Sequence, residues 1–327
     1  MPRLSVRFSL RTLMIVLTVA GFTIAISMKC YDARQRNSRA AVTLSGVGML
    51  RNRHESQPWS VGWRNRASYF LHGFDDTKLI DSFASTPIFK RGELSDDHAL
   101  SFLELENLEY IAIDSCSITD RSMEVIAKLS ALEGLAVTNT PVTSNGLQHF
   151  RAHPTLRYLN LDKTFISDDV CEHVATIANL LTFGCSETQI GDVGLRHLTN
   201  CRSIEEFRFD FTEVTDDGVS RLASLPRLTI VSLKGTNVRG NAFAQPGFSG
   251  LHTLFLDGSL VDDEGMYHIS QLPGLRCLSI EDTDVTETGL VHLRNASSLA
   301  QVYARSETVS AELEADINEF LQSRSRR

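Results

Sequence analysis

The sequence predicts an α/β solenoid in which each repeat supplies a strand, a turn and a short helix. Three observations predict this fold class: a motif that restarts at an almost constant interval, an alternation of apolar residues within it, and a helix-start signal after it. The chain has 327 residues. That length is ample for one elongated repeat domain with end caps.

Leucine or isoleucine opens nine repeats, which follow one another at intervals of 24 residues with one interval of 23. The opening residues are Leu108, Leu132, Leu156, Leu180, Ile204, Leu228, Leu251, Leu275 and Leu299. Counted from each, apolar residues recur at +3, +5, +10, +15 and +18, and Thr is common at +8. A constant period in this range indicates one supersecondary unit per repeat, stacked on its neighbours.

Each repeat begins with a predicted strand. Residues at +3 and +5 point inward, so side chains at +2, +4 and +6 face outward. A Thr or Ser at +11 before an Asp at +12, as in Thr215-Asp216, predicts a helix start, because the hydroxyl caps free amides and the carboxylate suits the helix dipole. Apolar residues at +15 and +18, such as Leu195 and Leu198, then share one helical face.

These residues resemble the leucine-rich repeat family, whose pattern L-x-x-L-x-L-x-x-N/C-x-L appears here with Thr in the N/C slot. The slot holds Thr140, Thr164, Thr188, Thr212, Thr236 and Thr283. Cys116 keeps the family's Cys, so the chain is similar to the 24-residue, cysteine-containing subclass. A hydroxyl can still bond the loop backbone from this inward position, so we expect the architecture to survive the change. The resemblance covers residues 94–320 and implies parallel strands on a concave face, helices on a convex face, and protein binding as the common use.

Charge is unevenly placed along the chain. Residues 1–66 hold 11 Lys and Arg against 2 Asp and Glu, a net charge of +9. Subtracting this from the total of −8 leaves −17 for residues 67–327. An acidic repeat region argues against nucleic acid as its partner, since phosphate binding requires Lys and Arg. Solubility is the alternative reason for the acidity.

An uncharged run of 17 residues, 12–28, lies between Arg11 and Lys29. As a helix it is about 25 Å long, against a hydrocarbon core of about 30 Å. It predicts an uncleaved signal-anchor, and the opening residues resemble the anchors of some bacterial membrane-attached repeat proteins. A cleaved signal peptide is the alternative. The three Arg of the short N-terminus favour a single-pass membrane protein with its repeats on the exported side.

The expected organisation has five parts. Residues 1–29 form the transmembrane anchor, 30–93 a basic juxtamembrane stalk and N-terminal cap, 94–298 the repeats, 299–321 a degraded last repeat with a capping helix, and 322–327 a tail. Trp59 and Trp63 are assigned to the cap, with a membrane-interface belt as the alternative. In the shortened repeat, Arg239-Gly240 replaces Thr-Asp and Pro246-Gly247 falls where other repeats continue their helix, which predicts a loop or a curtailed helix.

Signals of catalysis or metal binding are weak. Five histidines share position +17: His149, His173, His197, His268 and His292. Helices about 8–10 Å apart do not bring such imidazoles onto one Zn²⁺, and no Cys or carboxylate completes a ligand set. The six cysteines form no C-x-x-C pair and are expected to be mostly free thiols. No catalytic motif is present, so we expect no enzyme activity, cofactor or metal site.

The outward strand positions are the candidate binding residues. They are Tyr110, Asp114, Tyr158, Asn160, Asp162, Glu206, Arg208, Asp210, Phe255, Asp257, Glu281 and Tyr303. Acidic groups with scattered aromatic rings favour a protein partner of basic character, and a solvated surface is the alternative. Asn160 and the four Asp are expected to be exposed and dispensable for folding. The sequence therefore predicts a membrane-anchored, non-enzymatic protein-binding or scaffold module. A structural cell-envelope protein whose repeat arrays self-associate is the alternative, and an enzyme is the least favoured function.

Overall fold

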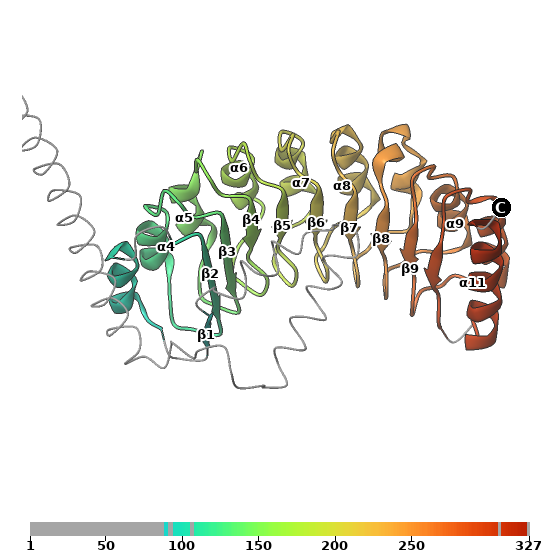
Figure 1. Ribbon diagram of the computed structural model, residues 1–327, viewed down its shortest axis with the longest axis horizontal. Helices are drawn as coiled ribbons and strands as arrows, with labels where there is room; N and C mark the ends of the chain where they lie inside the picture. The colour runs from blue at the N-terminus through green and yellow to red at the C-terminus, as the bar shows by residue number, and fades with distance from the viewer. Residues whose placement is uncertain (1–87, 91–93, 105–107, 307–308, 326–327) are drawn as a thin grey trace, which may run out of the picture.

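One strand from each repeat pairs with the next in a single parallel sheet, which follows the chain order from β1 to β10. The computed structural model describes residues 88–90, 94–104, 108–306 and 309–325. The strands are β1 (Ile88–Lys90), β2 (Tyr110–Asp114), β3 (Gly134–Thr138), β4 (Tyr158–Asn160), β5 (Thr182–Gly184), β6 (Glu206–Arg208), β7 (Ile230–Ser232), β8 (Thr253–Phe255), β9 (Cys277–Ser279) and β10 (Gln301–Tyr303). Figure 1 shows them forming the inner side of a curved array.

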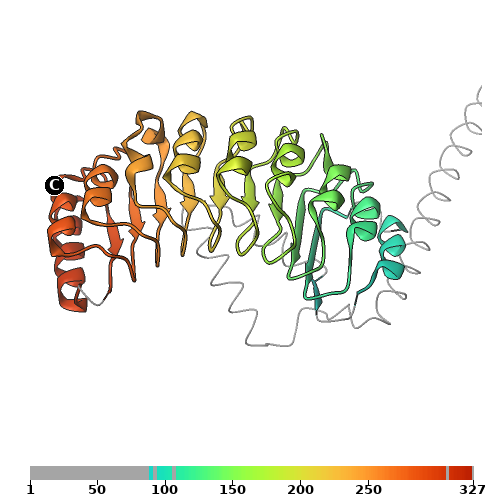
Figure 2. The ribbon, with the colours of Figure 1, turned by 180° about the vertical axis from the view of Figure 1, so that it is seen from behind.

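Short helices follow the strands on the outer side of the curve (Figures 1 and 2). The α-helices are α4 (Asp120–Ile126), α5 (Ser144–Leu147), α6 (Val170–Val174), α7 (Asp192–Leu198), α8 (Asp216–Arg221), α9 (Asp263–Ser270), α10 (Glu287–Leu290) and α11 (Ala311–Ser325). The 3-10 segments are η1 (Asp96–Glu104), η2 (Gln148–Phe150), η3 (Leu222–Ser224), η4 (Asn241–Ala244), η5 (Pro246–Gly250) and η6 (Val291–Asn295). The predicted α/β solenoid with a parallel sheet is confirmed.

The core lies between the sheet and the helices, and the predicted strand phase is correct. Leu159 and Leu161, at +3 and +5 of one repeat, are 1% and 0% exposed. In the middle of the array the same layer is aromatic: the Phe207 ring lies 5.1 Å from that of Phe209 and 6.4 Å from that of Phe183, centroid to centroid. Each repeat thus buries its apolar side chains against the repeats on either side.

Threonine in the N/C slot bonds the loop backbone, as predicted. The Thr164 hydroxyl donates to the Leu161 carbonyl at 2.6 Å. The same bond is made by Thr188, Thr212, Thr236 and Thr283, and by Ser259 in the shortened repeat's successor. Thr140 differs, because its buried hydroxyl has no hydrogen-bond partner among the described residues. A buried hydroxyl therefore bonds the backbone at the turn that ends the strand in most repeats.

Aspartates at +12 join each helix start to the next repeat, a role beyond the local helix-start signal. The Asp120 carboxylate accepts the Thr143 backbone N–H at 2.8 Å and the Thr143 hydroxyl at 2.6 Å. The residue packed against that carboxylate is Gly146, where an added Cβ would lie 2.7 Å from Asp120 Oδ1. Gly194, Gly218 and Gly289, also at +14, lie equally close to the +12 Asp of the repeat before them, so glycine at these positions leaves room for that carboxylate.

The shortened repeat has a curtailed helix, as predicted. Two 3-10 segments, η4 and η5, replace the α-helix, and Gln245 between them is extended, with φ −74° and ψ 132°. Pro246 stands at the start of η5, where its missing N–H is tolerated. At Gly247 a Cβ would lie 2.0 Å from the Ala223 carbonyl oxygen, so backbone from the preceding repeat packs directly against this segment.

Helix α11 covers the C-terminal end of the sheet (Figure 1). Leu321 is 1% exposed, and Leu313 and Ile317 pack against the core. The Asn318 side chain accepts the Val302 N–H at 2.8 Å and donates to the Val302 carbonyl at 2.8 Å. These two bonds satisfy the open backbone of the edge strand β10, which would otherwise be a site for pairing with another strand.

Nothing in the described part of the chain is a helix long and apolar enough to cross a membrane. The predicted anchor (residues 1–29) lies outside the described residues, as do most of the predicted stalk and cap, including Trp59 and Trp63.

Candidate functional site

The outward side chains of the sheet form three columns on the concave surface. Strand register aligns +2 with +2 and +4 with +4 in successive repeats, for example Tyr158 with Thr182 and Asn160 with Gly184. The first column, at +2, contains Tyr110, Tyr158 and Glu206; the second, at +4, contains Asn160, Arg208, Phe255 and Tyr303; the third, at +6, contains Asp114, Asp162, Asp210, Asp257 and Glu281. All twelve sequence-predicted residues thus belong to one surface.

Two tyrosines form an aromatic pair at the N-terminal end of the first column. The Tyr110 and Tyr158 rings are 6.4 Å apart between centroids, although one repeat separates them. Gly134 occupies the intervening position, where a Cβ would lie 2.4 Å from Tyr110 Cδ1. The Tyr110 hydroxyl donates to Glu133 at 3.2 Å. Burial and the Glu133 carboxylate raise the pKa of Tyr110 to about 12, so this hydroxyl stays a donor at neutral pH.

At the centre of the surface an arginine reaches across one repeat. The Arg208 guanidinium Nη2 lies 3.7 Å from Asp162 Oδ2, two repeats back. Gly184 lies between them. A Cβ added at Gly184 would lie 3.4 Å from Arg208 Nη2 and 3.4 Å from the Asn160 side chain. Arg208, Asn160 and Asp162 therefore converge over a glycine.

Glu206 is the most buried of the predicted charged residues. Its side chain faces the concave side, whereas that of the next residue, Phe207, faces the core. Even so, Glu206 is only 7% exposed. Burial raises the pKa of the Glu206 carboxyl to about 7, an effect that Arg208 opposes and Asp210 reinforces. The carboxyl therefore titrates near neutral pH.

The aspartates of the third column form hydrogen bonds to the following repeat and are only partly exposed, so the expectation that they are exposed is wrong. That they are dispensable for folding stays a prediction. Asp210 Oδ1 accepts the Ser232 hydroxyl at 2.6 Å and the Lys234 backbone N–H at 3.0 Å. Asp257 accepts the corresponding Ser279 hydroxyl, and the Glu281 N–H at 3.0 Å. Asp162 accepts the Ser186 N–H at 2.7 Å, and Asp114 the Thr138 hydroxyl at 2.7 Å. Charge-assisted bonds of this kind are among the stronger hydrogen bonds in proteins.

Asn160 is outward, as predicted, but it is only partly exposed. Its Oδ1 accepts the Asp162 backbone N–H at 2.9 Å. The side chain thereby shapes the turn at the end of β4, in addition to lying beside Arg208. Sequence periodicity predicted its outward direction but not its local partner.

The C-terminal part of the surface combines a cation with an aromatic ring. Lys234 Nζ lies 2.7 Å from Asp257 Oδ2 and 4.9 Å from the Phe255 ring centroid. Further along, the Tyr303 hydroxyl accepts from Gln301 Nε2 at 2.6 Å. Burial raises the pKa of Glu281, and the negative charge of Asp257 adds to that effect. Arg208 and Lys234 are therefore each paired with a third-column aspartate.

Three large apolar side chains at the rim were missed by the sequence analysis. Phe165, Phe211 and Leu260 are 65%, 62% and 37% exposed, at +7 or +9 of their repeats. Phe211 adopts the left-handed conformation, φ 55°, as every described non-glycine residue at +7 up to Asp282 does. Its ring covers Gly235, the next +7 residue, where a Cβ would lie 2.4 Å from Phe211 Cδ1. The sequence signal for this exposed ring is a phenylalanine at a turn position that recurs from repeat to repeat. The apolar periodicity does not include that position.

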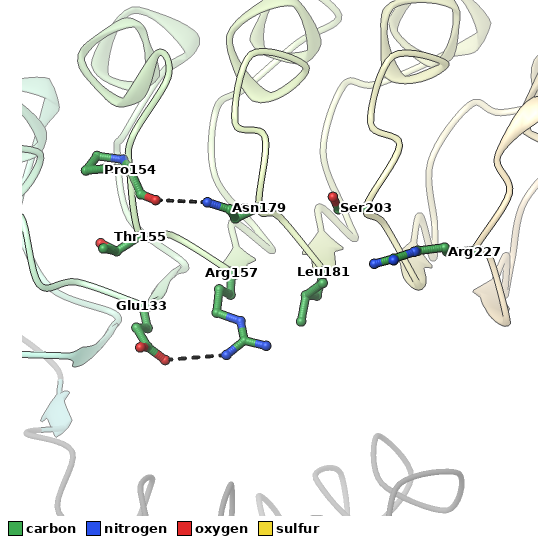
Figure 3. A pocket seen from close by; sticks show the side chains of 8 residues that line it. All are labelled: Glu133, Pro154, Thr155, Arg157, Asn179, Leu181, Ser203 and Arg227. Atoms are coloured by element: carbon green, nitrogen blue, oxygen red, sulfur yellow. Dashed lines mark hydrogen bonds and ion pairs between the residues drawn. The ribbon is translucent and has the colours of Figure 1, made fainter.

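A shallow pocket of about 410 Å³ lies near the N-terminal ends of strands β3 to β5 (Figure 3). Its lining residues are Glu133, Pro154, Thr155, Arg157, Asn179, Leu181, Ser203 and Arg227. Arg157 is 3.9 Å from Glu133, and Asn179 donates to the Pro154 carbonyl at 3.0 Å. The lining has a hydroxyl nucleophile in Ser203 but no His, Cys or Asp beside it, and Ser203 donates to the Ala178 carbonyl. No activated nucleophile is present in this pocket.

The histidine column lies on the helices of the convex side. His197 is 3.8 Å from Glu172, and Tyr267 contacts the rings of His268 and His292 at 5.4 and 5.5 Å between centroids. No group of three His, Cys, Asp or Glu within the described ranges could hold a metal ion. Five cysteines in these ranges are free, and burial raises the pKa of Cys171, Cys185 and Cys201.

Comparisons with known proteins concern the fold. The chain is similar to the solved structure of an internalin (inlF) of Listeria monocytogenes, with 18% sequence identity and a TM-score of 0.52; the match covers 64% of this chain and 57% of that one. It also aligns with internalin C2 of the same organism, at 20% identity and a TM-score of 0.48, over 64% of this chain and 84% of that one. No protein-family model and no curated protein matches the sequence. The chain thus has the curved, leucine-rich-repeat-like fold of the first internalin, over little more than half of that protein's length.

Proposed function

We propose that this protein is a membrane-anchored, non-enzymatic leucine-rich-repeat module that binds a protein partner, basic in character, through its concave surface. The repeats are assigned to the 24-residue, cysteine-containing subclass with Thr in the N/C slot. The observation that carries the proposal is the composition of the concave surface. Aromatic rings at both ends, Tyr110–Tyr158 and Phe255–Tyr303, flank a charged centre formed by the buried Glu206 and the partly exposed Arg208.

Such a surface suits a protein ligand for two reasons. Nine strands from β2 to β10, about 4.8 Å apart, span roughly 40 Å, which is the scale of a protein interface. Tyrosine and arginine are the residues that most often dominate binding energy, and partly desolvated charges select a partner of opposite charge. The net charge of −17 over residues 67–327 favours a basic partner over nucleic acid.

Photocrosslinking in intact membranes tests the binding surface. A photoreactive phenylalanine analogue replaces Thr182, which is in the first column between Tyr158 and Glu206. The control replaces Val193, which is half exposed on the convex helix α7. We expect a discrete crosslinked product from position 182 and none from position 193. Equal crosslinking from the two positions would count against the concave surface.

Membrane attachment rests on residues 12–28, which we propose as a single-pass anchor that places the repeats on the exported side. Full-length protein should stay in the membrane fraction after a high-salt wash, because salt removes molecules held only by screened charge. Removal of residues 1–29 should move it to the soluble fraction. A mature N-terminus at Met28 would instead mean a cleaved signal peptide.

Lateral self-association of the repeats at the cell envelope is the alternative function. It predicts that the photoreactive analogue crosslinks one copy of this chain to another, at whichever position faces the neighbour. Catalysis is the least supported role, since neither the concave surface nor the shallow pocket brings an activated nucleophile and a base together within the described residues.

A further inference from the structure

Glu206 presents its carboxyl on the concave surface at the middle of the first column. Its neighbours in that column are Thr182 on β5 and Ile230 on β7, as the strand register requires. Phe207, the next residue, is fully buried beneath the sheet. The alternation of a strand therefore directs the Glu206 side chain away from the core and toward the side where a ligand would lie.

This carboxyl is 7% exposed, yet no described residue donates a hydrogen bond to it or forms an ion pair with it. The two charged residues that follow on the same segment act on this carboxyl through their charges, Arg208 favouring its ionised form and Asp210 opposing it, but neither is hydrogen-bonded to it. Arg208 lies 3.7 Å from Asp162, and Asp210 accepts bonds from Ser232 and from the Lys234 backbone. A carboxyl that is largely buried and has no hydrogen-bond donor among the described residues gains from a ligand that supplies one.

We propose that Glu206 binds a lysine or arginine side chain of a separate protein that occupies the concave surface. The inference rests on the proposed function, and it names the chemistry by which that surface selects its partner. A cationic head would donate to the Glu206 carboxylate, while its methylene stem would lie against Ile230 and Thr182. Tyr158, two strands away and therefore about 10 Å off, would contact a neighbouring residue of the partner.

Charge complementarity selects a cation over a neutral donor. The third column beside Glu206 carries Asp162, Asp210 and Asp257, while the nearby Arg208 and Lys234 neutralise two of the three. With Glu206 ionised, this centre holds four carboxylates against two cations, so an added positive charge is favoured. A metal ion is the less suitable occupant, because no three ligating side chains in the described ranges converge.

Peptide selection on the full-length protein in detergent micelles tests the assignment. A random 12-residue library displayed on phage is the probe, and enriched peptides are measured against four proteins: the parent, T182W, E206Q and E205Q. Thr182→Trp fills the first column and identifies concave binders by their loss of binding. Glu205→Gln removes an adjacent carboxyl that lies one position before the column, and serves as the matched control.

Concave binders are expected to share one Lys or Arg. Their affinity should fall at least about tenfold on E206Q and less than about twofold on E205Q, because a charge-assisted bond is lost only in the first case. Replacing the shared Arg by citrulline should cost the same factor on the parent and nothing further on E206Q.

Two results overturn the inference while the binding function stands: concave binders without a shared cation, or a citrulline penalty that persists undiminished on E206Q. Self-association of the parent that E206Q abolishes also overturns it, since the occupant is then a second copy of this chain. If no enriched peptide loses binding to T182W, the concave surface itself is refuted as a peptide-binding site, and the inference falls with the proposed function.

Discussion

Asp192 and Thr215 are joined by two hydrogen bonds across the boundary between two repeats. The Thr215 N–H donates to Asp192 Oδ1 at 2.9 Å, and the Thr215 hydroxyl donates to Oδ2 at 2.7 Å. Thr215 also caps α8, because its Oγ1 accepts the Asp217 N–H at 3.2 Å. The same pairing joins Asp96 to Thr119, Asp120 to Thr143, and Asp263 to Thr286. One carboxylate thus fixes the start of the following helix.

Replacing Asp192 by Ala should destabilise the protein by about 1.5–3 kcal/mol, because the Thr215 N–H and hydroxyl lose a charged acceptor. Urea unfolding followed by circular dichroism measures the loss. Asp217→Ala is the control, since Asp217 is exposed on α8, and it should cost less than about 1 kcal/mol. Equal losses for the two variants would mean that the inter-repeat bonds contribute no net stability.

Two glycines offer a matched pair for the packing of this carboxylate. At Gly218 an added Cβ would lie 2.3 Å from Asp192 Oδ1, whereas at Gly191 it would meet nothing within 4 Å. Gly218→Ala should therefore destabilise the protein by about 1–3 kcal/mol, as overpacking does, and Gly191→Ala should stay within about 1 kcal/mol of the parent. Thermal unfolding of both variants provides the test. A Gly218→Ala protein as stable as the parent would show that Asp192 can move aside.

Strand phase gives a third comparison. Leu159 is 1% exposed and Asn160 beside it accepts one backbone hydrogen bond. Leu159→Ala should cost about 2–5 kcal/mol, and Asn160→Ala about 0.5–1.5 kcal/mol. Chemical unfolding under one condition ranks the two. Reversal of that order would contradict the assignment of Leu159 to the core.

Glu206 predicts a dependence of stability on pH. Its pKa is raised from 4.5 to about 7 by burial, so the folded protein holds this proton more tightly than the unfolded chain. The contribution to stability is fully present below about pH 4.5 and is lost as pH rises through 7. Glu206→Gln removes the titration. The variant should therefore gain stability relative to the parent between pH 5 and 8, by up to about 3 kcal/mol.

Unfolding free energies of the two proteins at several pH values measure this difference. Near pH 4.5, where the parent carboxyl is protonated, the two should be almost equal, which is the internal control. A difference that stays constant from pH 4.5 to 8 would show that the pKa of Glu206 is not raised by folding.

Repeat periodicity predicted which residues face inward, because a residue such as Leu161 must enter the core in every copy of the unit. The same periodicity placed all twelve candidate binding residues on one surface. It did not predict their partners, which belong to other repeats and depend on what lies between. Arg208 lies 3.7 Å from Asp162, two repeats back, and no single repeat contains both partners.

Turn geometry was also beyond the pattern. Position +7 is left-handed in successive repeats, yet it is filled by residues as different as Lys163, Glu187 and Phe211. Glycine is the residue that normally marks such a conformation, and here it does so at Gly235 and Gly258. The residue type at +7 therefore does not reveal that the backbone there is left-handed. For the same reason the exposed ring of Phe211 was not predicted.

Asn318 also bears on how an array of this kind can change in length over evolution. Its amide occupies both backbone groups of Val302 that a further strand would use. A duplicated unit added after β10 would have to displace α11 and leave Leu321, now 1% exposed, without its cover. A unit inserted between existing repeats would meet the same Asp, Thr and Gly contacts on both sides. Growth of this solenoid is therefore expected from within the array, with its C-terminal boundary inherited intact.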